Sequence, residues 1–201
     1  SLKSWDPAKG RADEVIPLIW APKQKRDDEH NVVEFKMRCV YDGRNEQCVA
    51  KLKGKSLDGF SPTLRHTTFK LHNATATVSK STITQFDVES AYLKGDLPQD
   101  EEFYVRPPAN AANGTVFRHF DDRRVAIVWR LKVPLYGQTM AGPYWHATFT
   151  NFLMSKRSFH QSEYDPCYFW KVLADGTRID IGIYVDDGWA THQGTADALA
   201  E

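Results

Sequence analysis

The sequence has few cysteines, no long apolar run and no excess of either charge. Its three cysteines, Cys39, Cys48 and Cys167, are odd in number and lack the spacing of a metal site, so we expect reduced thiols. No stretch approaches the ~18 consecutive apolar residues that span a bilayer, and the N-terminus lacks the basic-then-apolar pattern of a secretory signal. These absences exclude a disulfide-stapled secreted domain and predict an intracellular protein that does not enter a membrane.

The charge balance argues against a uniformly basic surface. The 26 basic residues equal the 26 acidic ones, whereas proteins that hold a nucleic-acid duplex usually present excess positive charge to the phosphates. A local basic stripe is still predicted, because basic residues flank an acidic loop at residues 27–31 and would form a two-stranded arm. The arm contains Lys23, Lys25, Arg26, Lys36 and Arg38. Taken alone, such a run is more often an ordinary solvated hairpin.

What the sequence does contain is a globular composition. With 201 residues, of which 41% are hydrophobic and 12% aromatic, the chain can form one or two compact domains with a sizeable core. Short strand patterns alternate with helix patterns, and hairpin signals gather towards the C-terminal end. This order predicts an α+β fold in which an antiparallel sheet is backed by helices.

Two helices are predicted from apolar spacing and start signals. The first covers about residues 63–79, with Ser61 as N-cap and Pro62 at the first helical position. Along one side of it recur Leu64, Leu71 and Val78. The second begins near Pro143 and is predicted to face the core with Trp145, Phe149, Phe152 and Leu153. Strands are predicted at residues 125–129, 168–172 and 179–185, the last two flanking a hairpin signal at residues 174–176.

A pair of acids ends the last of these strands. Isoleucines at 179, 181 and 183 alternate with polar residues up to Asp186 and Asp187, which predicts a half-buried strand that delivers two carboxylates to a hairpin tip. Gly188 completes the turn signal, because glycine tolerates positive φ. Adjacent carboxylates repel each other unless a cation joins them, so the feature favours a divalent metal. An ordinary Asp-Gly surface hairpin would give the same pattern.

A third acid lies far upstream. Residues 83–88 predict another short strand, which contains Asp87 and is followed by a short helix within residues 89–95. If the two strands are neighbours in one sheet, three carboxylates meet at one edge. Oxygen ligands of this kind suit Mg²⁺ or Mn²⁺, and two such ions about 3.5–4 Å apart activate a 3′-hydroxyl and stabilise a leaving pyrophosphate. The chemistry this predicts is nucleotidyl transfer.

Five ordered blocks resemble the reverse transcriptases of copia-type LTR retrotransposons. The blocks are residues 85–97 with 102–108, residues 131–145, residues 165–168, the Tyr-Val-Asp-Asp box at 184–187, and a basic hairpin with the Phe-Ser-Pro segment at 60–62. Together they cover roughly residues 17–194. The resemblance implies an RNA-directed DNA polymerase that uses two Mg²⁺ or Mn²⁺ ions, in a cytoplasmic particle or the nucleus. Its implied partners are an RNA or DNA template with primer, dNTP, and the thumb, ribonuclease H and integrase of a polyprotein.

The same resemblance implies a right-hand polymerase architecture and a set of site residues. Fingers are expected at residues 15–82 and 107–133, and a palm with an antiparallel sheet at residues 83–106 and 134–201, after a flank at 1–14. The metal set is Asp87, the carbonyl of Val88, Asp186 and Asp187, with Asp187 third because alternation points it away from Asp186. The implied nucleotide-binding residues are Lys25, Lys36, Arg38, Tyr92, Tyr136 and Gly137. Tyr184 is expected beside the primer end.

Several alternatives stay open at this point. Tyr92 matches the family's aromatic steric gate, but a packed core tyrosine is a serious rival, and Trp145 is expected in the core. Residues 48–59 depart from the family pattern because they are longer and basic, and both ends of the chain look cut, with no thumb. The chain could therefore be a catalytically silent, nucleic-acid-binding remnant. The acids alone would also allow an unrelated metal-dependent phosphotransferase or cyclase.

Overall fold

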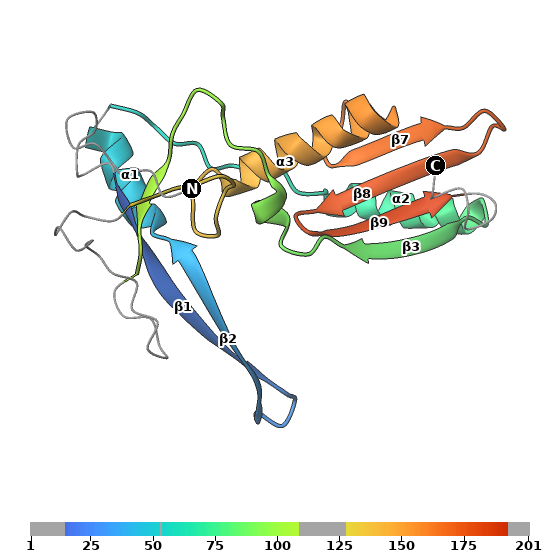
Figure 1. The fold of residues 1–201 in the computed structure, drawn as a ribbon. Helices are drawn as coiled ribbons and strands as arrows, with labels where there is room; N and C mark the ends of the chain where they lie inside the picture. The colour runs from blue at the N-terminus through green and yellow to red at the C-terminus, as the bar shows by residue number, and fades with distance from the viewer. Residues whose placement is uncertain (1–14, 53, 109–127, 193–201) are drawn as a thin grey trace, which may run out of the picture. The chain divides into compact units, whose positions relative to one another are not determined.

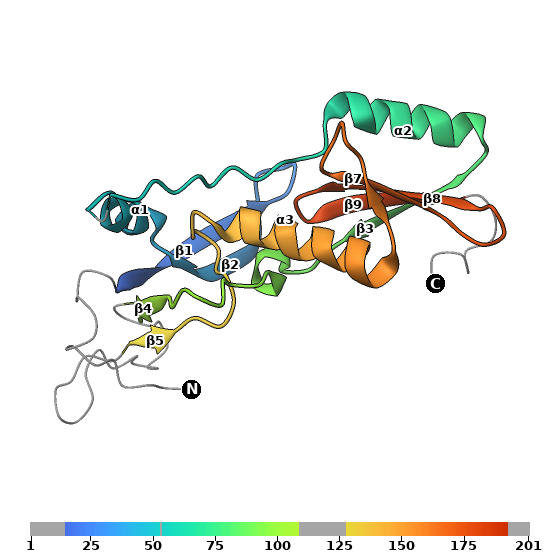
Figure 2. The ribbon, with the colours of Figure 1, turned by 90° about the horizontal axis from the view of Figure 1, so that it is seen from above.

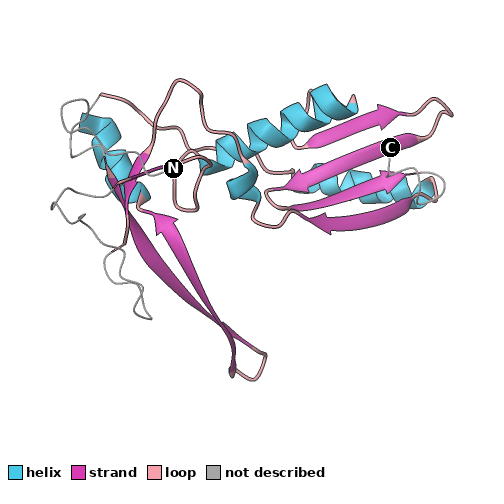
Figure 3. Cartoon of the chain, viewed as in Figure 1, coloured by secondary structure: helices cyan, strands magenta, loops and turns pink. Residues whose placement is uncertain are grey.

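The fold is that of a computed structural model, which describes residues 15–52, 54–108 and 128–192. Helices and strands are interspersed and most strand pairs are antiparallel, which confirms the predicted α+β class (Figure 3). Contacts divide the chain into two compact units (Figure 1). The first unit comprises residues 1–59 and 96–141, and the second comprises residues 60–95 and 142–201.

The first unit contains a four-stranded sheet with the order β2-β1-β4-β5. Its elements are β1 (Ile16–Arg26), β2 (Val32–Tyr41), α1 (Gly43–Leu52), β4 (Tyr104–Arg106) and β5 (Trp129–Arg130). Strands β1 and β2 form a long antiparallel hairpin in which Lys23 lies opposite Lys36. The predicted two-stranded basic arm is therefore confirmed. A small core of Ile16, Leu18, Tyr41 and Val105 lies at the base of the hairpin.

The second unit contains a five-stranded sheet with the order β3-β9-β8-β7-β6. Its strands are β3 (Thr82–Asp87), β6 (His160–Gln161), β7 (Tyr168–Val172), β8 (Arg178–Tyr184) and β9 (Asp187–His192). Its helices are α2 (His66–Val78), the short 3₁₀-helix η2 (Ala91–Lys94), α3 (Ala141–Asn151) and the π-helical turn η3 (Phe152–Lys156), which continues α3. The strand predicted at 83–88, the short helix after it and the hairpin around residues 174–176 are confirmed.

Helices α2 and α3 cover opposite faces of this sheet (Figure 2). Phe69 of α2 packs edge-on against Trp189 of β9, with ring centroids 4.5 Å apart. Phe149 of α3 packs against Phe169 of β7, on the other face, at 6.1 Å. The alternation predicted for β8 is confirmed, because Ile179 and Ile183 are buried among the core residues while Tyr184 is exposed. The second unit therefore has three layers, with α2 on one face of the sheet and α3 on the other.

The start and the apolar side of α2 differ from the prediction. The helix begins at His66 with Arg65 as N-cap, so Ser61 does not cap it, and the Asp165 carboxylate accepts the Arg65 N–H at 3.0 Å. Leu71 and Val78 do share one side, but they are 68% and 85% exposed. The buried side instead carries His72 and Ala76. The His72 ring can be buried there because it forms a hydrogen bond with the Thr191 hydroxyl of β9.

The prediction for α3 is confirmed at three of its four apolar positions. Trp145 and Leu153 are buried and Phe149 is packed against the same core, but Phe152 is 45% exposed. The π-helical turn begins at Phe152, so the regular 3.6-residue spacing on which the prediction rests ends there. The exposed ring is covered instead by the Arg157 guanidinium, 5.6 Å from its centroid.

Some predictions lie outside the described residues or cut across the observed units. The strand predicted at 125–129 is seen only from Val128 onward, because residues 109–127 fall outside the described residues. Residues 60–82 were assigned to the fingers, yet they belong to the same compact unit as the three acids.

Within the described ranges, no helix is long and apolar enough to span a bilayer.

Candidate active site

The structure places Asp87 directly opposite Asp187. The two are Cα partners at the end of the β3–β9 ladder, although they lie 100 positions apart (187 − 87). Directly opposed residues of an antiparallel pair point to the same face, with Cβ atoms about 4.5–5.5 Å apart. Strand β9 was not predicted, and it separates β3 from β8 in the sheet. The acid that faces Asp87 across the ladder is therefore Asp187. The sequence analysis ranked Asp187 third among the metal ligands, because alternation along an unbroken strand would point it away from Asp186.

Asp186 lies in the turn between β8 and β9. Tyr184 pairs with Asp187, so Val185 and Asp186 are the two central residues of the hairpin. The residue with positive φ is Val185, at 60°, and not Gly188, so the predicted position of the turn is wrong. A β-branched residue in this region is rare, and such strain costs about 1–3 kcal/mol unless surrounding contacts impose it. The turn that carries Asp186 must therefore be held by its neighbours.

Two hydrogen bonds and one ring contact hold the turn. The indole N–H of Trp145 donates to the Val185 carbonyl at 2.7 Å, and the Val88 N–H donates to the Asp186 carbonyl at 2.8 Å. Gly188 lies under the Phe86 ring, and a Cβ added there would overlap ring carbons of Phe86. Sequence reasoning placed Trp145 in the core but missed its bond to the turn. The only signal for that bond is the polar N–H of an otherwise buried side chain.

The three acids have no cationic partner within the described residues. No ion pair to Asp87, Asp186 or Asp187 is formed there. Like charges directly opposite each other in a sheet are destabilising, and a divalent cation would reverse that effect. The opposed Asp87 and Asp187 supply oxygen atoms, the ligand type that such ions take in proteins. In the part of the chain that the structure describes, however, no three His, Cys, Asp or Glu side chains gather closely enough to hold a metal together.

The basic arm of the first unit brings Lys25 and Lys36 to the same carboxylate. The Lys25 and Lys36 ammonium groups lie 3.3 Å and 3.5 Å from Glu34. Although partial desolvation acts in the opposite direction, the hydrogen bond from Lys25 and the charge of Lys36 lower the pKa of Glu34. Arg38 lies on the same face of the hairpin, with its guanidinium 5.1 Å from the centre of the Tyr136 ring. Both lysines are therefore partly neutralised by a neighbour on the hairpin.

The remaining predicted nucleotide-binding residues have structural roles as well. The Tyr136 carbonyl accepts the Tyr41 N–H at 2.8 Å, and Gly137 has a φ of 90° with the Tyr41 carbonyl against the space of a Cβ. Only glycine fits that close approach without strain. Tyr92 belongs to the second unit and packs, partly buried, against its core, whereas Tyr184 is 50% exposed. Tyr92 thus contributes to the packing of the second unit.

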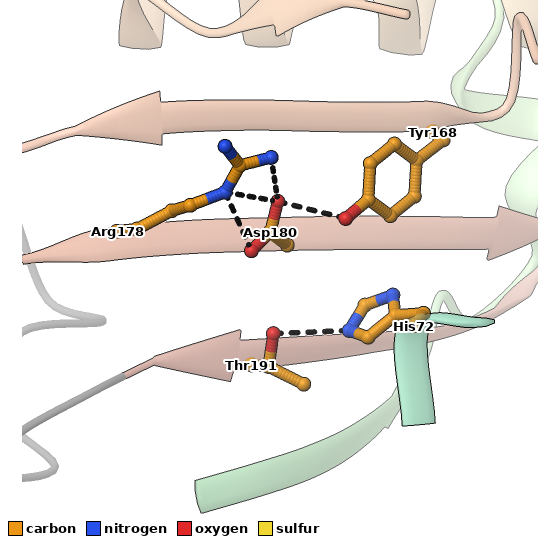
Figure 4. Close-up of polar contacts among 5 residues, drawn as sticks. All are labelled: His72, Tyr168, Arg178, Asp180 and Thr191. Atoms are coloured by element: carbon orange, nitrogen blue, oxygen red, sulfur yellow. Dashed lines mark hydrogen bonds and ion pairs between the residues drawn. The ribbon is translucent and has the colours of Figure 1, made fainter. Parts of the chain in front are cut away.

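A second polar cluster lies on the α2 face of the sheet, and the sequence analysis did not single it out (Figure 4). Asp180 accepts a hydrogen bond from the Tyr168 hydroxyl at 2.8 Å and pairs with the Arg178 guanidinium at 2.9 Å. These residues and His72 line a groove of about 670 Å³ beneath α2. Because the Asp180 carboxylate is already paired with Arg178, the cluster presents no unpaired acid and is not a metal site.

Burial of His72 predicts a pH dependence of stability. Burial lowers the pKa of His72, the Asp180 charge opposes that effect, and the Arg178 charge adds to it. A depressed pKa means that the unfolded chain binds the proton more readily, so the stability contributed by neutral His72 is complete above about pH 6.5 and is lost as the pH falls through the folded-state value. The melting temperature, followed by circular dichroism from pH 7 to 5, should fall less in His72→Gln than in the wild type. Parallel curves would contradict this prediction.

Comparison with known proteins identifies the family. The family described as reverse transcriptase (RNA-dependent DNA polymerase) matches residues 5–196, which is nearly the whole chain. The chain belongs to the reverse transcriptase family. This membership leaves no support for an unrelated phosphotransferase or cyclase.

Individual relatives of this reverse transcriptase chain are transposon polyproteins. It is 29% identical over 169 residues to the retrovirus-related Pol polyprotein from transposon TNT 1-94 of Nicotiana tabacum, covering 84% of this chain and 12% of that protein. It is 28% identical over 192 residues to the transposon Ty1-NL2 Gag-Pol polyprotein of Saccharomyces cerevisiae, covering 92% and 9%. The predicted copia-type resemblance is confirmed. The chain spans about a tenth of the length of these relatives.

Proposed function

We propose that the chain is the fingers and palm portion of an RNA-directed DNA polymerase that transfers nucleotides with the help of two divalent metal ions. The observation that supports this most directly is the pairing of Asp87 with Asp187, two opposed carboxylates without a cationic partner in the described residues, in a chain of the reverse transcriptase family. Asp186 adjoins them in the turn. Directly opposed like charges destabilise a sheet, and a bound divalent cation would offset that repulsion.

In this proposal the chain supplies oxygen ligands and the metal supplies Lewis acidity. Asp87 and Asp187, with the Val88 carbonyl and with Asp186 after its side chain rotates towards them, would hold Mg²⁺ or Mn²⁺, whose chemistry is to activate the primer hydroxyl and stabilise the leaving pyrophosphate. The Val88 N–H donates to the Asp186 carbonyl, so the peptide plane between Asp87 and Val88 is fixed beside the turn that carries Asp186. Tyr184, exposed next to the turn, would contact the primer end.

All of the proposed nucleotide-binding residues except Tyr92 belong to the first unit. Lys25, Lys36 and Arg38 of the basic arm would contact the triphosphate, for which Glu34 now stands in as an anionic partner. Tyr136 and Gly137 would form the adjoining wall, and Tyr92 would stack under the sugar. The first unit corresponds to fingers and the second to palm in this proposal, with residues 60–82 moved to the palm and residues 96–106 and 134–141 moved to the fingers.

Primer extension on an RNA template tests the proposal. The chain should be assayed joined to the polyprotein sequence that follows it, because polymerases take most of their duplex affinity from phosphate contacts along its length. We expect Mg²⁺-dependent incorporation that follows the template, loss of product with a chelator, and recovery when Mg²⁺ is returned. Duplex binding without any incorporation would instead support the catalytically silent remnant.

A substitution at Tyr92 separates its two candidate roles. If the ring excludes the ribose 2′-hydroxyl, Tyr92→Val should raise incorporation of ribonucleotides relative to deoxyribonucleotides by about tenfold or more, since one lost steric contact of this kind is worth at least ~1–3 kcal/mol. The measurement is the ratio of kcat/KM for the two nucleotides. Tyr168→Phe, an aromatic change in the same unit, is the control. If the ratio of kcat/KM for the two nucleotides did not change while the melting temperature fell, Tyr92 would be a core residue and not a steric gate.

A further inference from the structure

The peptide group between Val185 and Asp186 is held from inside the core of the second unit. Its carbonyl accepts the indole N–H of Trp145 at 2.7 Å. Trp145 belongs to α3, is only 6% exposed, and packs against Phe149 with ring centroids 5.4 Å apart. Because a peptide group is planar, fixing the Val185 carbonyl also fixes the direction in which the chain enters Asp186.

The Val185 carbonyl is the acceptor that the structure provides for the Trp145 N–H. A cavity of about 10 Å³ lies between Trp145, Phe149 and Val185, at the lower limit for a single water molecule, so water is a poor substitute for the carbonyl. Rotation of the peptide would leave a buried donor unpaired, which is unfavourable in a protein interior. The bond therefore selects the orientation of the central peptide of the turn, which is set by ψ of Val185 and φ of Asp186, in a turn whose first central residue has a φ of 60°.

We infer that Trp145 is a positioning residue for Asp186: its indole N–H, not its ring volume alone, fixes the main chain of the turn, so that only the Asp186 side chain has to rotate to reach a metal ion held by Asp87 and Asp187. This inference rests on the proposed function. Trp145 touches neither substrate nor metal in it, and acts only through the Val185 carbonyl. The Val88 N–H, which holds the next carbonyl, completes a two-point anchorage of the turn.

The test separates the hydrogen bond from the ring. Replacing Trp145 by β-(3-benzothienyl)alanine, incorporated at this one position, keeps the shape of the ring and removes the N–H. Mn²⁺ binding to the full chain, measured from the free-ion electron paramagnetic resonance signal, should weaken about tenfold, as it does when partners that orient metal ligands are removed. In primer extension, kcat should fall about tenfold with KM for dNTP little changed, while the melting temperature stays close to that of the wild type.

Two controls make the outcomes distinguishable. Leu153→Ala removes core volume from the same unit but does not line the cavity beside Val185, and should lower the melting temperature while leaving Mn²⁺ affinity unchanged. Asp186→Asn should abolish the tightest Mn²⁺ binding. Wild-type Mn²⁺ affinity in the benzothienyl variant would overturn the inference while leaving the polymerase proposal intact. Mn²⁺ binding in the wild type that Asp186→Asn does not alter would overturn both.

Discussion

Asp187→Asn should make the metal-free chain more stable and at the same time nearly inactive. Asp87 and Asp187 face each other across the β3–β9 ladder without a cationic partner in the described residues, and removing one of two opposed like charges stabilises a sheet by about 0.2–1 kcal/mol. The same change removes a proposed metal ligand. Since a bound metal supplies several kcal/mol of transition-state stabilisation, we expect incorporation to fall by at least ~100-fold. Asp87→Asn should behave in the same way.

The opposed signs of the two effects are the distinguishing result. The melting temperature without metal and the rate of primer extension should move in opposite directions, and the gain in melting temperature should shrink as salt is added, because salt screens exposed charges. Glu89→Gln is the matched control, since it removes one exposed acid close in sequence that is not part of the ladder. If Asp187→Asn instead lowered the melting temperature, the two carboxylates would not be repelling each other, and the case for a metal between them would be lost.

Gly188→Ala should cost both stability and activity. The Phe86 ring lies over Gly188 on the neighbouring strand, and an added Cβ would overlap ring carbons of Phe86, one of them at 2.6 Å. Phe86 precedes Asp87 and Gly188 follows Asp187, so relief of the overlap has to move the backbone of one acid or displace the ring. Overpacking of this kind costs about 1–3 kcal/mol. We expect a lower melting temperature and a rate of incorporation reduced at least tenfold.

A double substitution checks the cause. Phe86→Leu shortens the side chain over Gly188, so Gly188→Ala should cost clearly less in a Phe86→Leu background than in the wild type. The control is Gly176→Ala, at a glycine with a φ of 86° and no atom within 4 Å of an added Cβ. That change should cost stability through backbone strain alone and leave incorporation unchanged. Equal costs of Gly188→Ala in both backgrounds would show that the Phe86 ring is not the obstacle.

Local patterns in the sequence predicted the elements of the fold better than their faces. The alternation of isoleucines specified β8 and its buried side, because one strand face meets the core along its whole length. Helix α2 was predicted, but the side of the helix that is buried was predicted wrongly. Leu71 and Val78 are exposed, while His72 is buried. Apolar spacing cannot show that a threonine on another strand will satisfy a histidine ring. Phe152 was misplaced for a related reason, because spacing assumes a regular helix and a π-turn begins there.

The acids of the candidate site were predictable as residues but not as a geometry. Asp87, Asp186 and Asp187 stand out because carboxylates end two strand patterns. Their arrangement depends on β9 entering the sheet between β3 and β8, and on a turn with its positive φ at Val185 instead of at the glycine. Both depend on tertiary contacts, among them the bond from Trp145 in α3. A pattern read along the chain holds no information on such contacts between distant segments.

The interleaving of the two units bears on how the protein folds as it is made. Within the described residues β3 pairs only with β9. The backbone N–H and C=O groups of β3 therefore have no strand partner while the next 100 residues (187 − 87) are synthesised. At the usual pace of about 5–20 residues per second, that wait lasts roughly 5–20 s. During it the uncharged stretch from Thr82 to Phe86 is open to pairing with other chains. Closure of the acid-bearing ladder is thus a late, long-range event, and its speed sets how long the nascent chain is exposed to aggregation.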